Sequence, residues 1–206
     1  DATDFAIGFH NATQKRKADA FLALATMEKL TDFQKAVALE QAALLDKANA
    51  DPVIERIPIE AVKMAAQMQN LLSRGKASEV IARFADEDLS RWPFWKRGDG
   101  YHLRGRAHYI AKDGARAEAD LAKALPWISE PRTRDSVMMT LALNRERNLG
   151  DDTGAFQAFT AVVSDQARIG SADDYGALMG IARIQTRRGQ FEEALRTLKR
   201  ANLDKL

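Results

Sequence analysis

The stretch RGRAHYIAKDGARAEADLAKAL, residues 104–125, decides the fold. It has an apolar segment, then a short polar turn with a glycine, then an alanine-rich segment in which Ala117 and Leu121 stand four positions apart. A step of four places both side chains on one face of an α-helix. The stretch therefore predicts two amphipathic helices joined by a tight turn.

Three further stretches share this pattern, at 71–84, 144–163 and 184–201, and a weaker copy lies upstream at 30–48. In each clear copy a small or branched residue opens the apolar face of the second helix, and a larger apolar residue follows four positions later. These pairs are Val80 and Phe84, Ala117 and Leu121, Ala155 and Phe159, and Ala194 and Leu198. Their spacing of 37 to 39 residues predicts a helical repeat.

Glycines stand between the two predicted helices of each of the four clear copies. Gly75, Gly150 and Gly189 fall where the first helix should end, a position that favours the left-handed conformation that glycine adopts easily. In the copy at 104–125 the glycine, Gly114, comes two places later, which predicts a turn of different construction.

Polar residues ahead of the helices predict their N-caps. Thr31 and Gln34 have the spacing of a capping box, and the pairs 135–136 and 173–174 (Asp-Ser and Asp-Asp) are further candidate caps. No stretch alternates polar and apolar residues with the β-branched enrichment of a strand. The predicted fold class is all-α.

Composition bounds the chemistry of the chain. Its 206 residues include 31 Lys and Arg against 29 Asp and Glu, so near-neutral charge argues against wholesale binding of polyanions. The absence of cysteine excludes disulfides, thiolate metal sites and cysteine nucleophiles. No apolar run has the length of a membrane helix, and no signal-peptide pattern follows Asp1. Because the first residue is not Met, we expect a processed chain or a fragment, and the compartment stays open.

The chain resembles the tetratricopeptide-repeat (TPR) family. In the stretch 104–125, Gly105, Ala117 and Ala124 match the small-residue positions of that family's repeat, although the period here is longer than the family's ~34 residues. The resemblance implies stacked antiparallel helix pairs that form a right-handed superhelix, and a role as a protein-binding scaffold.

On this basis we predict one helical repeat domain over residues 15–206, preceded by a lead-in or linker over residues 1–14. The repeats are expected at about 15–50, 61–90, 98–128, 136–165 and 175–206.

The resemblance also implies which residues face the concave side of the superhelix, because the first helix of each pair lines it in that family. These residues are His102, Arg106, Tyr109, Thr140, Asn144, Arg147, Asn148, Met179, Arg183 and Arg187. The expected groove is rich in guanidinium and amide groups and holds no carboxylate except that of Asp99 at its edge. Such groups recognise carboxylates, so an extended acidic peptide is the expected ligand, although a merely solvated helix face fits the same residues.

We therefore expect a non-catalytic protein-interaction scaffold, with no cofactor and no metal site. The three histidines lack metal-ligand spacing, and no phosphate-binding or nucleophile motif occurs. The alternative is a helical accessory domain of a larger protein, such as an enzyme whose catalytic domain precedes this segment.

A third interpretation concerns the segment 91–116, which combines seven Lys or Arg residues with five aromatic residues. Such a mixture binds single-stranded nucleic acid in some proteins. We favour the alternative that Trp92, Phe94 and Trp95 pack into the core between repeats.

Overall fold

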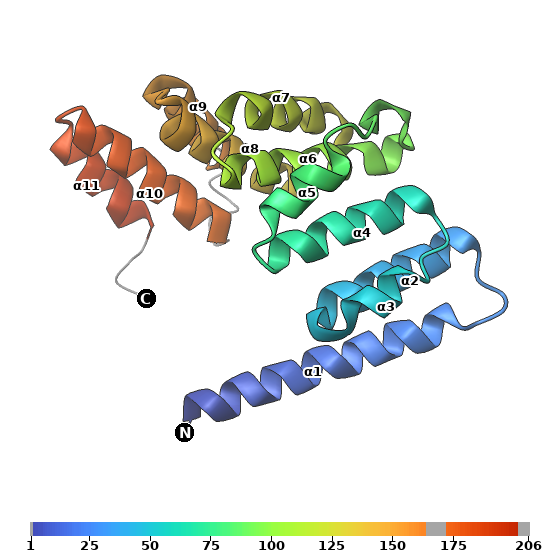
Figure 1. The fold of residues 1–206 in the computed structure, drawn as a ribbon. Coiled ribbons are helices and arrows are strands. Elements are labelled where there is room, and N and C mark those ends of the chain that lie inside the picture. The colour runs from blue at the N-terminus through green and yellow to red at the C-terminus, as the bar shows by residue number, and fades with distance from the viewer. Residues whose placement is uncertain (1, 164–171, 202–206) are drawn as a thin grey trace. The chain divides into compact units, whose positions relative to one another are not determined.

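The computed structural model describes residues 2–163 and 172–201. Within these residues every regular element is helical and no strand occurs, which confirms the predicted all-α class (Figure 1). The chain divides into two compact units, Asp1–Lys96 (unit 1) and Arg97–Leu206 (unit 2).

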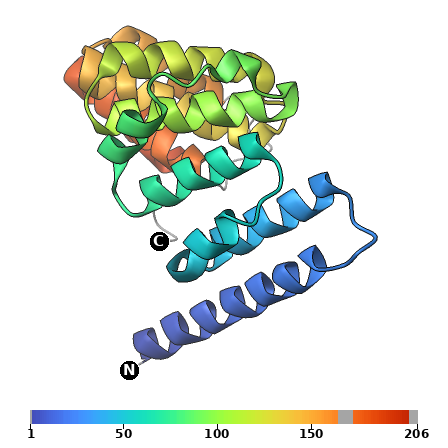
Figure 2. The same ribbon diagram turned by 45° about the vertical axis from the view of Figure 1, so that its right-hand side comes forward.

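Unit 1 is built on the packing of α1 along α2, which is evident in both views (Figures 1 and 2). Small residues of α2, such as Ala36 and Ala42, are buried together with Leu39 and with Ile54 of α3. The elements of unit 1 are α1 (Ala2–Ala25), α2 (Asp32–Leu45), η1 (Lys47–Asn49), α3 (Ala50–Ile54), α4 (Glu60–Ser73), α5 (Ala77–Phe84) and η2 (Leu89–Arg91), followed by the first residues of α6 (Phe94–Ile110).

Unit 2 continues with antiparallel helix pairs. The small and large residues of the repeat pattern are buried, as predicted, at Ala117, Leu121, Ala155 and Phe159, and Ala194 is buried in the last pair. The elements after α6 are α7 (Gly114–Ala124), η3 (Leu125–Trp127), α8 (Pro131–Asn144), η4 (Arg145–Leu149), α9 (Asp152–Val162), α10 (Ala172–Arg187) and α11 (Phe191–Arg200).

The predicted helix starts are partly correct. The capping box at α2 is confirmed, since Gln34 N–H donates to Thr31 Oγ1 at 3.3 Å and Thr31 N–H donates to Gln34 Oε1 at 3.0 Å. The predicted cap at 135–136 is wrong, because Glu130 caps α8 ahead of Pro131. The predicted cap at 173–174 is also wrong, because α10 already begins at Ala172.

The aromatic residues of the segment 91–116 do not share one environment. Trp92 is buried, as predicted, and its Nε1–H donates to Glu87 at 3.0 Å. Trp95 is half-exposed and meets the edge of Phe33 at a ring distance of 5.1 Å. The prediction that Phe94 packs into the core is wrong, since 70% of it is exposed on the first turn of α6.

The turn between α6 and α7 is built as the sequence predicts, in a different way from the others. Gly150, like the other two turn glycines, has a positive φ (67°), whereas the left-handed residue after α6 is Lys112, with φ of 63°. Gly114 instead opens α7, where an added Cβ would lie 2.7 Å from Leu149 and 3.0 Å from Asn148. Gly114 thus allows α7 to pack closely against Leu149 and Asn148, and the unfavourable left-handed backbone conformation falls on Lys112 instead.

Replacing Lys112 with glycine should therefore stabilise the protein. We expect Lys112→Gly to raise the free energy of unfolding by about 1 kcal/mol in urea denaturation, because the left-handed backbone is unfavourable for a residue with a Cβ. The matched variant is Gly150→Ala, which has open space for its methyl group and should lower the free energy of unfolding by about as much. An unstable Lys112→Gly variant would contradict this account of the turn.

Candidate functional site

The candidate site of unit 2 lies at the end of α8. The helix continues into η4, a π-helical turn, and closes at Gly150 with Asp151 N–H donating to the carbonyl of Arg145 at 2.8 Å. A π-helical turn changes the register of the side chains that follow it and is frequent at functional sites. Within this turn Glu146 contacts α10 and Asn148 contacts α6.

Glu146 lies between two arginines of α10. Its Oε1 accepts hydrogen bonds from Arg183 Nε at 2.7 Å and from Arg187 Nη2 at 2.9 Å. Arg187 also binds Asp152 of α9 through two nitrogens, at 3.1 and 2.6 Å. Because Tyr109 and Arg147 adjoin these residues, we name the set of Tyr109, Glu146, Arg147, Asp152, Arg183 and Arg187 the arginine cluster.

The charges of the arginine cluster reinforce one another. Burial, with 4% of the Glu146 side chain exposed, raises the pKa of that carboxyl, but the hydrogen bonds and charges of Arg183 and Arg187 outweigh it and hold the pKa below its ordinary value. The hydrogen bond that Arg187 donates to Asp152 likewise lowers the pKa of that carboxyl, and the hydrogen bond that Arg183 donates to Glu146 raises the pKa of Arg183. All four groups are therefore ionised at neutral pH.

Arg147 differs from the other two arginines of the cluster. Its side chain is exposed, and its Nη1 donates to the hydroxyl of Tyr109 at 3.3 Å. Among the described residues no carboxylate pairs with it. Arg147 is therefore the guanidinium of the cluster that has no carboxylate bound to it.

Two asparagines from the predicted groove instead hold the helices together. Asn144 is fully buried, and its Nδ2 donates to the carbonyl of Gly114 at 3.0 Å. Asn148 donates to the carbonyl of Tyr109 and to Asn144 Oδ1, each at 3.0 Å. These amides stabilise the contact of α8 and η4 with the α6–α7 turn, where buried backbone carbonyls require donors.

The remaining predicted site residues lie at different depths. His102 is buried in α6, and its Nε2 has no hydrogen-bond partner. Arg106 and Thr140 are partly buried, and Thr140 donates to the carbonyl of Ser136 within its own helix. Met179 is 42% exposed on α10, one helical turn before Arg183. His102 and Asn144 thus lie beneath the surface that the sequence assigned to them.

The predicted composition of the groove is wrong in one respect. We expected no carboxylate apart from Asp99, but Glu146 lies in the middle of the arginines and Asp152 flanks them. Sequence reasoning missed Glu146 because a helical period of 3.6 places it off the stripe formed by the neighbouring site residues. Glu146 lies in the π-helical turn, which departs from that period, and no feature of the local sequence predicts the turn.

The described residues hold no cluster of three or more His, Cys, Asp or Glu side chains that could bind a metal ion. Among the same residues, no helix is both long enough and apolar enough to cross a membrane.

Comparisons with known proteins bear on the fold. Neither the models of known protein families nor the curated protein sequences give a match to this chain. Among solved structures, the chain is similar to one from Podosopora anserina described as a kinesin light chain with nearly identical TPR-like repeats. The two share 16% identity over 94% of this chain and 95% of that one, with a TM-score of 0.53. At this identity the likeness shows the fold, which is that of a TPR-like helical repeat.

The burial of His102 predicts how the free energy of unfolding depends on pH. Burial lowers the pKa of His102 to about 3, and the charge of Arg106 adds to the effect. Below the ordinary value of 6.5 the unfolded chain therefore binds a proton that the folded chain does not, so stability falls as the pH falls from 6.5 toward 3. His102→Gln should remove this dependence, which amounts to at most about 1.4 kcal/mol per pH unit.

The measurement is the free energy of unfolding in urea between about pH 7 and about pH 4.5, compared with that of the His10→Gln control. His10 lies on α1 with an exposed side chain. Parallel curves for wild-type protein and His102→Gln would show that His102 is not the group that responds to acid.

Proposed function

We propose that the chain is a non-catalytic interaction scaffold, a degenerate member of the TPR family, which binds an extended segment of a partner protein at the arginine cluster. The TPR-like fold supports this proposal, because stacked helix pairs offer an extended surface formed by the first helix of each pair. In unit 2 these helices are α6, α8 with its continuation η4, and α10. The arginine cluster takes its residues from α6, η4 and α10, together with Asp152 of α9.

The proposal rests on one observation: among the described residues, no carboxylate pairs with Arg147. Two of the three arginines in the cluster are already paired with Glu146 and Asp152, so the set as a whole has one positive charge left. The exposed Arg147 guanidinium has a planar face and donors that suit a carboxylate. A ligand with one well-placed carboxylate satisfies it, whereas the further carboxylates of a long acidic run would find Arg183 and Arg187 already paired.

Met179 refines the chemistry of the ligand. It shares a face of α10 with Arg183, four positions later, and 42% of it is exposed. A flexible thioether side chain of this kind accepts apolar partners of varied shape. We therefore propose that the bound segment has an acidic residue for Arg147 and an apolar residue for Met179.

We predict that charge reversal at Arg147 weakens this binding strongly. Short random peptides displayed on phage are selected on the full chain, and the enriched peptides are synthesised and titrated by fluorescence anisotropy. Arg147→Glu should weaken their affinity by about tenfold or more, since it replaces an attraction with a repulsion. Arg132→Glu, the same change at an exposed position on the first turn of α8, should leave the affinity unchanged.

Peptides that bind Arg147→Glu as tightly as wild-type protein would contradict the proposal. The alternative role, as an accessory domain of a larger enzyme, makes a different prediction. In that case the arginine cluster contacts another part of its own chain, and the selection yields no peptide that depends on Arg147.

A further inference from the structure

One face of α11 is apolar and is not covered by any described helix. The buried side of α11 includes Ala194 and Thr197, and the helix packs on α10. On a neighbouring face, Phe191 is 67% exposed and Leu195 is 55% exposed. Because these two residues are four positions apart, they form one apolar stripe along the helix. In Figure 1, α11 lies beyond α10, at the edge of unit 2.

The corresponding face of α9 is covered by the helix that follows it. In the register of the repeat, Asp152 and Phe156 of α9 occupy the two positions of the α11 stripe. Asp152 binds Arg187 of α10 at 2.6 Å, and the guanidinium of Arg188, directly after α10, lies 5.3 Å from the centre of the Phe156 ring. Both positions of α9 therefore contact the next helix or the residue that ends it.

The corresponding face of α7 is covered in the same way. Its two positions are Gly114 and Glu118. Glu118 Oε1 accepts a hydrogen bond from Arg145 Nε at 2.9 Å, and an added Cβ at Gly114 would lie 2.7 Å from Leu149. Arg145 and Leu149 both belong to η4, which continues α8. In two successive pairs, then, this face of the second helix holds the helix that comes next.

The residue types of the α11 stripe suit a helix and not solvent. An end of a helical repeat that stays in water needs a polar outer face. Phe191 and Leu195 are instead large and apolar, and they stand where the earlier pairs contact the next helix. The stripe is therefore a docking surface for a helix that is absent from the described chain.

The charges beside the stripe indicate which helix fits it. The first turn of α11 is acidic, with Glu192 and Glu193, and its last turn is basic, with Lys199 and Arg200. Glu193 pairs with Arg196 of its own helix at 2.8 Å, whereas among the described residues neither Glu192 nor Lys199 forms an ion pair. Glu192 and Lys199 are both exposed and are seven residues apart, so they lie on the same side of the stripe, two helical turns from each other.

We propose that this face of α11 binds the α11 helix of a second copy of the chain, in an antiparallel pair. A two-fold axis beside Leu195 places the first turn of one helix against the last turn of the other. Glu192 of each copy then pairs with the partner's Lys199, and Leu195 packs against the partner's Leu195. A parallel pair would bring Glu192 against the same residue of the other copy, so the charges favour the antiparallel pair.

The size of the stripe sets the strength of this dimer. One helix face from each copy buries less surface than the roughly 1,200–2,000 Å² of stable interfaces, so the dimer is weak and depends on protein concentration. The stripe and the two charges beside it share no residue with the arginine cluster. The dimer is therefore independent of the function proposed for that cluster.

The first test is sedimentation velocity of the full chain from about 10 µM to about 1 mM. Leu195→Asp places a charge within the stripe, and it should raise the dissociation constant of the dimer by about tenfold or more. Ile110→Asp is the matched control, at a 49% exposed residue that ends α6, and it should leave the dissociation constant unchanged. Thermal unfolding followed by circular dichroism checks that both variants fold.

An exchange of charges tests the antiparallel arrangement itself. Glu192→Lys and Lys199→Glu should each weaken the dimer by about tenfold, because each brings like charges together at two symmetry-related places. The double variant restores opposite charges, so its dissociation constant should return to within about threefold of the wild-type value. Glu28→Lys, an exposed control in unit 1, should have no effect.

Three outcomes would overturn the proposal. The first is a wild-type chain that stays monomeric at the highest concentration. The second is a dimer that Leu195→Asp does not weaken, because the contact would then lie away from α11. The third is a double variant that associates no better than the single ones, because the two helices would then not be antiparallel. None of these variants changes the arginine cluster, so failure here is distinguishable from failure of the proposed peptide binding.

Discussion

The carboxylate of Glu146 lies between the guanidinium groups of Arg183 and Arg187, almost out of contact with solvent. It joins η4 to α10, and Asp152 extends the same set of ion pairs to α9. Only Glu146 of this set is buried, since its partners are each more than a third exposed, so removal of the arginines would leave its carboxylate unpaired out of reach of most solvent, which is costly. The ion pairs therefore hold η4, α9 and α10 together, and they also neutralise two of the three arginines of the cluster. What the surface offers a partner depends on the charge that remains, at Arg147.

Close approach of the helices makes this arrangement possible. An added Cβ at Gly105 would lie 2.8 Å from Leu121, and one at Gly180 would lie 2.5 Å from the ring of Phe159. Small residues on one helix thus accept large residues of its neighbour, which is the packing that the repeat pattern encodes. The buried amide of Asn144, which donates to the carbonyl of Gly114, adds a polar contact at the same depth. Packing and polar contacts together set the separation at which Glu146 reaches α10.

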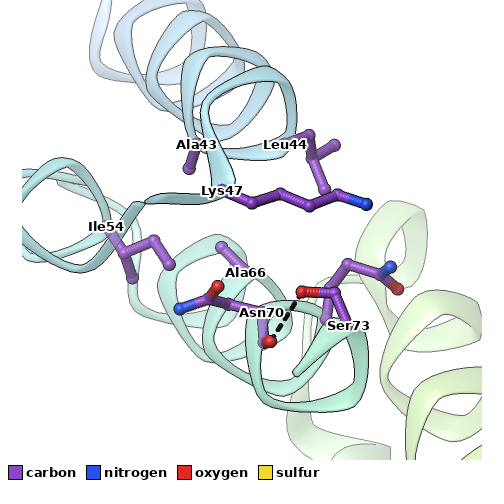
Figure 3. Close-up of a pocket in the computed structure, with 8 residues that line it drawn as sticks. Ala43, Leu44, Lys47, Ile54, Ala66, Asn70 and Ser73 are labelled. Atoms are coloured by element: carbon purple, nitrogen blue, oxygen red, sulfur yellow. Dashed lines mark hydrogen bonds between the residues drawn. The ribbon is translucent and has the colours of Figure 1, made fainter. Parts of the chain in front are cut away.

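The fold can be predicted from the sequence because the patterns that indicate it are local and repeated. The helix class, the turn glycines and the buried pairs such as Ala155 and Phe159 all follow from residue type and spacing. The site was harder to predict, since a stripe drawn at 3.6 residues per turn assumes a regular helix. Glu146 lies in the π-helical turn at 145–149 and contacts two arginines of α10, and Asn144 is buried. The small pocket of unit 1 that Ala43, Ile54 and Asn70 line (Figure 3) has no sequence signature, because residues of α2, α3 and α4 form it together.

The most direct test of this account is the mobility of the arginine side chains, measured by NMR of the guanidinium groups in the free protein. The hydrogen bonds to Glu146 should restrict rotation of the Arg183 guanidinium, and those to Glu146 and Asp152 should restrict that of Arg187. Arg147, whose guanidinium is bonded to the Tyr109 hydroxyl alone, should rotate freely. In Glu146→Gln, Arg183 should become as mobile as Arg147, while Arg187 should stay partly restricted by Asp152. Equal mobility of Arg147 and Arg183 in the wild-type protein would contradict the account, because it would mean that Glu146 does not select which arginine is available.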